Sequence, residues 1–468
     1  MKIIRKLNRA NRSGRLNIGF VSTRFNGTDG VTLEAFKWGE VLGQAGHSCF
    51  WFSGELSTAD DHSYLVPEAH FKNAQNLWID ERIWGVEARD AAVTERIHLL
   101  RASIKQRLHD FIDTCSIDLL IAENALSIPM NVPLGLALSE AIAETGIPTV
   151  AHHHDFYWER SRYAVNGVND YLHMAFPPSL PNIRHIVINT PAREALALRT
   201  GIAAAVIPNV LDFATPPATD EERCRRFRTS IGLDPDDIMI LQPTRIIQRK
   251  GIEHSIQLVR KLNDHRAKLV ISHEAGDEGY DYLRWLTDYA EDMGVDLHLV
   301  HTPVSSPWSG MNAINGSFTL WDIYPNADFV TYPSTCEGFG NAFLEAVYFR
   351  KPILINRYDT FIRDIEPQEF ELIVMDGFLS RELVRSVRET LSSPARRQQM
   401  TEANYTKAAR LYSYDVLRKG LAAVFEELLP DLQRPLFDPA SEKENIVYLR
   451  PFSVHHSKTA SGEAPRIV

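Results

Sequence analysis

Two glutamates eight positions apart, Glu337 and Glu345, flank a glycine-containing turn in this 468-residue chain. Apolar residues surround Glu345, and an ionised carboxylate in such surroundings is costly unless hydrogen-bond donors reach it. Ribose hydroxyls are suitable donors. The backbone amides of residues 338–342 open a helix, where phosphate binds readily. The spacing therefore indicates a nucleotide site, with the alternative that Glu345 only pairs with an arginine or caps its own helix.

The residues around these glutamates predict the elements that position them. Residues 328–332 form a short apolar run typical of a buried parallel strand, and residues 342–349 form an apolar helix that is stopped by Pro352. Residues 353–355 resume the sheet. Strand, turn, helix and strand make a βαβ unit, whose turn lies at the carboxyl edge of the sheet, where open α/β sheets bind ligands.

Two motifs in this region resemble those of a known enzyme family. The stretch PSTCEGFGNAFLEA, which holds both glutamates, is similar to the signature of retaining glycosyltransferases of the GT-B fold, specifically glycosyltransferase family 4 (glycosyl transferases group 1). Upstream, PTRIIQRKG at 243–251 is similar to the strand-end arginine and the lysine five residues later that bind the diphosphate in that family. The similarity extends over most of residues 16–430.

The resemblance implies a role for each matching residue. Glu337 would contact the donor sugar and Glu345 the ribose, while Arg245 and Lys250 would bind the diphosphate. A histidine at the end of a first-domain strand lines the donor-sugar pocket in this family, and His154 matches that position best. The expected catalytic residues are therefore Glu337, His154, Arg245 and Lys250. The expected donor-binding residues are Arg245, Lys250, Glu337, Gly338, Phe339, Gly340, Asn341, Ala342 and Glu345.

Strand and helix patterns alternate along two stretches of the chain, one from residue 16 and one from residue 238. Together with the resemblance, this alternation predicts a GT-B fold, with two Rossmann-like α/β/α domains and a deep cleft between them. The expected parts are a basic segment (1–15), an acceptor-binding domain (16–212), a linker (213–237), a nucleotide-sugar-binding domain (238–410), a helix crossing back to the first domain (411–430) and a tail (431–468).

Composition narrows the class of protein. Lys and Arg number 50 against 60 Asp and Glu, a net charge of −10, so no nucleic-acid partner is expected. Four scattered cysteines without a C-x-x-C pair argue against a disulfide framework or a zinc knuckle. With no long apolar run and no signal peptide visible, we expect a cytoplasmic protein. The first fifteen residues carry six cations, and a solvated terminus is favoured over a membrane-surface segment. The oligomeric state stays open.

The loop after the first strand, residues 23–30, lacks G-x-G-x-x-G, so there is no nicotinamide or flavin fingerprint. The resemblance implies that this loop faces the acceptor and the donor phosphates. The alternative is a plain strand-to-helix turn. The expected acceptor-binding residues of the loop are Gly27, Thr28, Asp29 and Gly30.

A polar and aromatic cluster follows the strand that ends near residue 151, beginning with three consecutive histidines. Adjacent residues on an extended segment point in alternating directions, so we do not predict a metal site. Aromatic faces suit a sugar ring and arginine forks suit a carboxylate or phosphate, although the aromatics would also serve to pack the domain. The expected acceptor-binding residues here are His153, Asp155, Tyr157, Trp158, Arg160 and Arg162, of which His153 is the second match to the family histidine.

These patterns predict an enzyme that moves a hexose from a nucleoside-diphosphate sugar to a small polar acceptor, such as a sugar acid or a glycosylglycerate. Retention of configuration follows from the resemblance alone. No Asp-x-Asp stands at a strand end, so neither a metal nor another cofactor is expected. The acidic body of the protein disfavours an anionic membrane surface. The alternatives are a lipid or polysaccharide acceptor, a nucleotide-sugar epimerase, a phosphorolytic enzyme with pyridoxal, and a non-catalytic sugar-nucleotide-binding protein.

Overall fold

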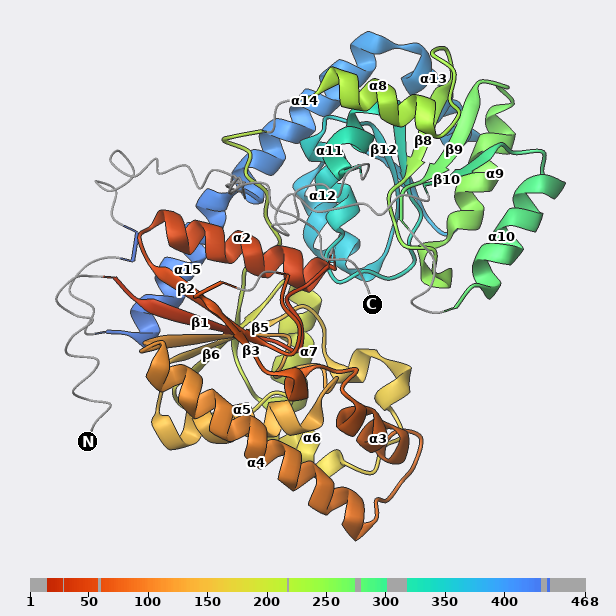
Figure 1. The fold of residues 1–468 in the computed structure, drawn as a ribbon. Coiled ribbons are helices and arrows are strands. Elements are labelled where there is room, and N and C mark those ends of the chain that lie inside the picture. Colours follow the sequence, from red (N-terminus) through yellow and green to blue (C-terminus); the bar gives the residue numbers. More distant parts are fainter. Residues whose placement is uncertain are drawn as a thin grey trace, which may run out of the picture.

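A computed structural model describes residues 15–27, 29–57, 60–216, 219–273, 279–300, 318–430 and 436–437. The predictions for residues 1–14, for Thr28 and for the tail beyond residue 437 lie outside these ranges. Two α/β domains make up the described part (Figure 1). The chain passes between them twice, and the two crossings lie side by side, because Leu211 forms a parallel bridge with Ser413.

The first domain is built on a parallel sheet in the order β3-β2-β1-β4-β5-β6-β7. The central strands β4 and β5 are buried along their whole length, as expected for a sheet covered on both faces. The strands are β1 (Asn17–Val21), β2 (Ser48–Ser53), β3 (Ser63–Leu65), β4 (Leu119–Glu123), β5 (Thr149–His153), β6 (Ile183–Val187) and β7 (Ala204–Val206).

Helices cover both faces of this sheet. The helices α4 and α5 pack together on one face and α2 lies on the other (Figure 1). The helices of the first domain are α2 (Gly30–Gln44), α3 (Ala74–Ile83), α4 (Ala91–Thr114), α5 (Val132–Thr145), α6 (Asn169–Ala175) and α7 (Thr190–Thr200).

The second domain repeats the architecture with a parallel sheet in the order β10-β9-β8-β11-β12-β13. Its strands are β8 (Ile238–Gln242), β9 (Ala267–Ile271), β10 (Leu297–Leu299), β11 (Phe329–Tyr332), β12 (Ile353–Asn356) and β13 (Ile373–Met375). Its helices are α8 (Glu221–Ser230), α9 (Ile252–Leu262), α10 (Asp281–Asp292), α11 (Leu320–Ile323), α12 (Asn341–Tyr348), α13 (Arg381–Ser392) and α14 (Pro394–Leu411).

Helix α15 (Tyr414–Leu428) belongs to the first domain in space, although it ends the described helices of the chain. Its buried Leu417 and Leu421 join the core under α2, and the Tyr414 hydroxyl donates to Glu40 Oε2 at 2.8 Å. The chain therefore returns to its starting domain after α14, as Figure 1 shows in blue.

The two parallel sheets with their helices confirm the predicted α/β class. Residues 213–237, expected as a linker with a charged helix at about 221–229, contain that helix as α8, whose buried Phe227 packs in the core of the second domain. Several elements were not predicted. Among them β3, α6, α11 and β13 are too short to show a clear hydrophobic period. The longer α3 was missed as well.

Candidate functional site

The donor motifs of the second domain meet because β8 and β11 are neighbours in its sheet. Arg245 and Lys250 follow β8, and Glu337 follows β11, so all three lie at one carboxyl edge. Lys250 and Glu337 form a nearly buried ion pair, and Arg249 Nη1 lies 3.4 Å from the same carboxylate. Burial alone would raise the pKa of Glu337, but the ammonium of Lys250 and the guanidinium of Arg249 outweigh it and hold that pKa below its usual value.

The turn before α12 is shaped by Gly340, whose φ of +119° is open to glycine alone. A Cβ at this position would also lie 2.4 Å from the Tyr358 hydroxyl. That hydroxyl donates to the carbonyl of Phe339 at 2.9 Å and holds the turn in place. The first amides of α12 are thereby presented at the edge of the sheet.

Glu345 lies inside α12 and is bonded to a tyrosine. The hydroxyl of the fully buried Tyr324 donates to Glu345 Oε2 at 2.8 Å. Burial raises the pKa of Glu345 to about 7, although this hydrogen bond and the charge of Lys37 oppose the rise. Among the described residues, no arginine pairs with Glu345. Its partner Tyr324 was not indicated by the sequence.

The first domain meets this turn through two of its own loops. Asp29 caps α2 by accepting a hydrogen bond from the Thr32 amide at 3.0 Å. A Cβ on Gly30 would lie 3.2 Å from Asn341 Nδ2, so the N-termini of α2 and α12 approach one another. Such N-termini carry partial positive charge, which favours a diphosphate nearby, and at α2 the Asp29 carboxylate already uses one of the amides.

Further contacts join the domains at the same place. Asn189 Nδ2 donates to the carbonyl of Gly338 at 2.6 Å, and Asn209 Nδ2 donates to Asn341 Oδ1 at 2.7 Å. The carbonyl of His154 lies 3.2 Å from the position that a Cβ on Gly338 would take. The structure therefore brings His154 beside the glycine turn, together with the residues of the donor motifs.

The three histidines separate as strand alternation requires, but two of them meet a carboxylate from another strand. His153 Nε2 lies 2.9 Å from His185 Nδ1, away from its two neighbours. The β4–β5 register pairs Glu123 with His152, and Glu123 Oε2 lies 2.9 Å from His152 Nδ1 and 3.6 Å from His154 Nε2. Burial raises the pKa of Glu123 to about 7 and lowers that of His152 to about 3.

Glu123, His152 and His154 are also a group that could hold a metal ion, because their ligand atoms lie within 4.8 Å of one another. The sequence-based argument against a metal site used the alternation of adjacent histidines and did not include a ligand from another strand. Neutral imidazoles beside a glutamate equally form the hydrogen bond seen between Glu123 and His152.

The residues after His154 are largely engaged with one another. Arg160 pairs with Asp155, which also accepts from Asn124 Nδ2 at 2.8 Å. Trp158 stacks on Phe156 with ring centroids 4.4 Å apart. The remaining two residues predicted to bind acceptor here are Tyr157, which packs against the first-domain core, and Arg162, whose guanidinium lies over the Tyr163 ring at 4.5 Å.

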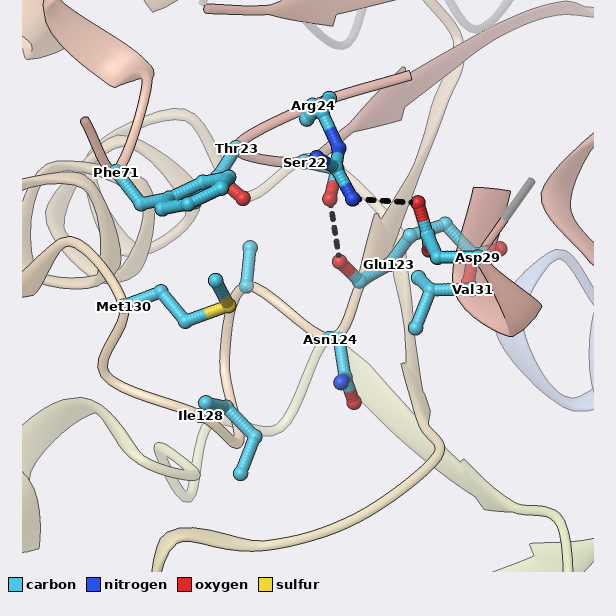
Figure 2. Close-up of a pocket in the computed structure, with 11 residues that line it drawn as sticks. Ser22, Thr23, Arg24, Asp29, Val31, Phe71, Glu123, Asn124, Ile128 and Met130 are labelled. Atoms are coloured by element: carbon cyan, nitrogen blue, oxygen red, sulfur yellow. Dashed lines mark hydrogen bonds and ion pairs between the residues drawn. The ribbon is translucent and has the colours of Figure 1, made fainter. Parts of the chain in front are cut away.

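A pocket opens beside this cluster, at the carboxyl ends of β1 and β4. It encloses about 410 Å³ of empty space, its open mouth included. Figure 2 shows Phe71 and Met130 on one side of it and Asp29 and Glu123 on the other, with Arg24 reaching towards Asp29. Sequence reasoning singled out Asp29 alone among these. Arg24 lies in the short loop after the first strand, which ends at Val21, and this position is the signal that would have found it.

The chain as a whole is similar to several known proteins. A family model described as glycosyl transferases group 1 matches residues 311–407. The mannosylglucosylglycerate synthase of Thermotoga maritima is 30% identical over 446 residues, which cover 89% of this chain and 100% of the relative. The mannosylglucosylglycerate synthase of Petrotoga mobilis is 31% identical over 381 residues, 76% of this chain and 86% of the relative.

A solved structure supports the fold. Anabaena HepE, in complex with UDP and glucose, superposes with a TM-score of 0.60 at 14% identity, covering 88% of this chain and 99% of that one. The GT-B fold predicted from sequence is thus confirmed. Among the described residues, no helix is long and apolar enough to cross a membrane.

Proposed function

This chain belongs to the group 1 glycosyltransferases, and we propose that it transfers a hexose from a nucleoside-diphosphate sugar to a hexosylglycerate, with retention of the anomeric configuration, as a cytoplasmic member of glycosyltransferase family 4. The acceptor class comes from the names of the two similar synthases. The observation that carries the proposal is the approach of two helix N-termini, those of α2 and α12, beside Arg245 and Lys250.

Charge development assigns a role to each donor residue. As the bond from the anomeric carbon to the diphosphate breaks, negative charge grows on the leaving phosphate and positive charge on the sugar ring. Arg245, Lys250 and the amides at the start of α12 stabilise the phosphate, because donors fixed in advance cost no reorganisation during the reaction. Glu345 holds the ribose, and the buried Tyr324 orients its carboxylate through their hydrogen bond. No metal is needed in this proposal, since these groups supply the positive field.

The sugar itself is oriented from both domains. Glu337 is kept ionised by Lys250 and Arg249 and accepts hydrogen bonds from sugar hydroxyls. His154, whose backbone lies against Gly338, contributes its ring from the opposite side. Retention then places the acceptor hydroxyl on the face from which the diphosphate departs, which is the face towards the first domain.

The test is a matrix of common nucleotide sugars against hexosylglycerates, free hexoses and lipid extracts. We expect free nucleoside diphosphate to form only with a hexosylglycerate, and the anomeric coupling constant of the product to match that of the donor. Transfer to lipid extracts alone would refute the acceptor class. An inverted product would refute retention.

The same matrix separates the remaining alternatives. An epimerase would convert the nucleotide sugar without any acceptor, and a phosphorolytic enzyme would require free phosphate. An absorbance scan of the purified protein reports pyridoxal directly. A protein that only binds sugar nucleotides would show saturable binding with no turnover in any combination.

A further inference from the structure

The pocket between β1 and β4 lies where the strand order of the first sheet reverses. β1 and β4 are neighbours, but the chain leads from β1 to β2 on one side and from β4 to β5 on the other. A crevice forms at such a point, and open α/β sheets bind ligands there. The second sheet has its equivalent point between β8 and β11, where Arg245 and Glu337 lie. Each domain thus offers one such edge.

The pocket borders the donor turn at two points. Asp29 in its wall is followed by Gly30, whose Cβ position is 3.2 Å from Asn341. Glu123 in its wall lies 3.6 Å from the ring of His154, whose carbonyl reaches the glycine turn. A ligand in the pocket therefore sits next to the donor sugar.

An unpartnered polar atom in the pocket wall favours a polar ligand. The Oε1 atom of Glu123 is buried and has no hydrogen-bond partner among the described residues, and the side chain is fully buried. Sugar hydroxyls are donors that would satisfy it.

Arg24 supplies the positive charge of the pocket. Its Nη2 donates to Asp29 Oδ2 at 2.8 Å, and its guanidinium lies 5.4 Å from the ring centre of Phe71. The side chain keeps about a third of its surface exposed. Asp29 also accepts a hydrogen bond from the Thr32 amide. Its carboxylate is therefore fixed at the start of α2, where it positions the Arg24 guanidinium and does not stand as a free negative charge in the cavity. The remaining N–H groups of the guanidinium make no hydrogen bond within the described part of the chain.

We propose that this pocket binds the acceptor and that Arg24 makes it selective for an acceptor carrying a carboxylate. The inference rests on the proposed function. The planar guanidinium pairs with a carboxylate through two parallel hydrogen bonds, while Glu123 accepts from the sugar of the acceptor and Phe71 offers an apolar face to its ring. The sequence favoured Arg160 and Arg162 for this task, but neither lines the pocket. Arg160 is bonded through two nitrogens to Asp155, and Arg162 lies over the Tyr163 ring.

The test exchanges charge on the protein and on the acceptor separately. Arg24→Gln is assayed with a hexosylglycerate and with the corresponding hexosylglycerol, which has a hydroxymethyl group in place of the carboxylate. We expect kcat/KM for the acid to fall about 100-fold and kcat/KM for the neutral analogue to change by less than about threefold. Arg24→Lys should recover part of the loss, and KM for the donor should stay unchanged in both variants.

The matched control is Arg89→Gln, because Arg89 likewise pairs with an aspartate, Asp170, and lies over an aromatic ring, that of Tyr171, outside the pocket. It should leave the ratio of the two acceptors as in wild type. An equal loss for both acceptors in Arg24→Gln would overturn the inference while glycosyl transfer stands. If the wild-type protein uses no hexosylglycerate at all, the proposed function fails, and the inference fails with it.

Discussion

Burial raises the pKa of Glu345 to about 7, so both its protonated and its ionised form are populated near neutral pH, and a ligand can shift the balance between them. Ribose hydroxyls donate to the ionised form, so binding should release a proton. Between pH 6 and pH 8 the ionised fraction of a group with this pKa rises about tenfold, and affinity for the free nucleoside diphosphate should rise by a similar factor. Calorimetric titration in buffers of different ionisation enthalpy measures both the affinity and the proton.

The variant Glu345→Gln is the control for this prediction, because the diphosphate's own titration affects both proteins equally. It should bind more weakly at pH 8 and lose the extra pH dependence. The sign for folding is the opposite. A carboxyl whose pKa is raised by burial destabilises the folded state as pH rises from about 4.5 to 7, so the ligand-free variant should unfold at no lower temperature at pH 8. Parallel pH profiles in the two proteins would contradict the ribose role.

A substitution at Arg245 tests catalysis with little effect on stability, because this residue is exposed at the edge of the second sheet. Arg245→Ala should lower kcat about 100- to 1,000-fold, the loss typical when one preorganised donor to a developing anion is removed. Its unfolding temperature should stay close to that of wild type. Lys250→Ala should lower kcat as well, but it also leaves Glu337 buried without its ammonium and should unfold earlier. Wild-type turnover by Arg245→Ala would remove it from the donor site.

At the scale of elements, the start of α12 depends on Gly340. Gly340→Ala forces φ = +119° on a residue with a Cβ and drives that atom onto the Tyr358 hydroxyl. We expect a loss of about 1–3 kcal/mol in unfolding free energy and weaker nucleotide binding, because the helix amides move. Gly43→Ala is the control: that glycine lies within α2 with open space at its Cβ position, and alanine there should stabilise the protein by about 0.5–1 kcal/mol. Chemical denaturation and calorimetry measure both.

The local sequence pattern predicted the elements that carry the donor motifs. It missed residues that join the site only through the pairing of strands in the sheet. The bounds of α12 were predicted within one residue, because apolar period, glycine and proline mark them in the sequence. Glu123 ends an apolar strand with nothing beside it in sequence to mark it. It becomes a site residue because the β4–β5 register sets it opposite His152, 29 positions later. Such pairings belong to the sheet and are not visible in either segment alone.

Both apolar and polar contacts hold the two binding edges facing one another, and Ile188 of the first domain packs in the same core as Phe339 of the second. The ion pair of Glu194 with Arg363 is exposed and contributes little. The bond from Asn209 to Asn341 is different, since Asn209 is buried and its partner opens α12. Because the donor contacts groups of both domains, its affinity depends on how often the facing arrangement is populated.

Asn209→Ala should therefore weaken donor binding through the arrangement of the domains, since the substitution removes a contact between them and not a proposed contact with the donor. Loss of one buried hydrogen bond is worth about 1–2 kcal/mol, so we expect KM for the nucleotide sugar to rise about five- to 30-fold, with a smaller change in kcat. Asn182→Ala removes a comparable bond, to the Ile147 carbonyl at 2.8 Å, wholly inside the first domain, and should leave KM for the donor unchanged. Small-angle scattering of the ligand-free proteins should show a larger radius of gyration for Asn209→Ala alone. Equal radii together with an unchanged KM would mean that this contact does not set the balance between open and facing domains.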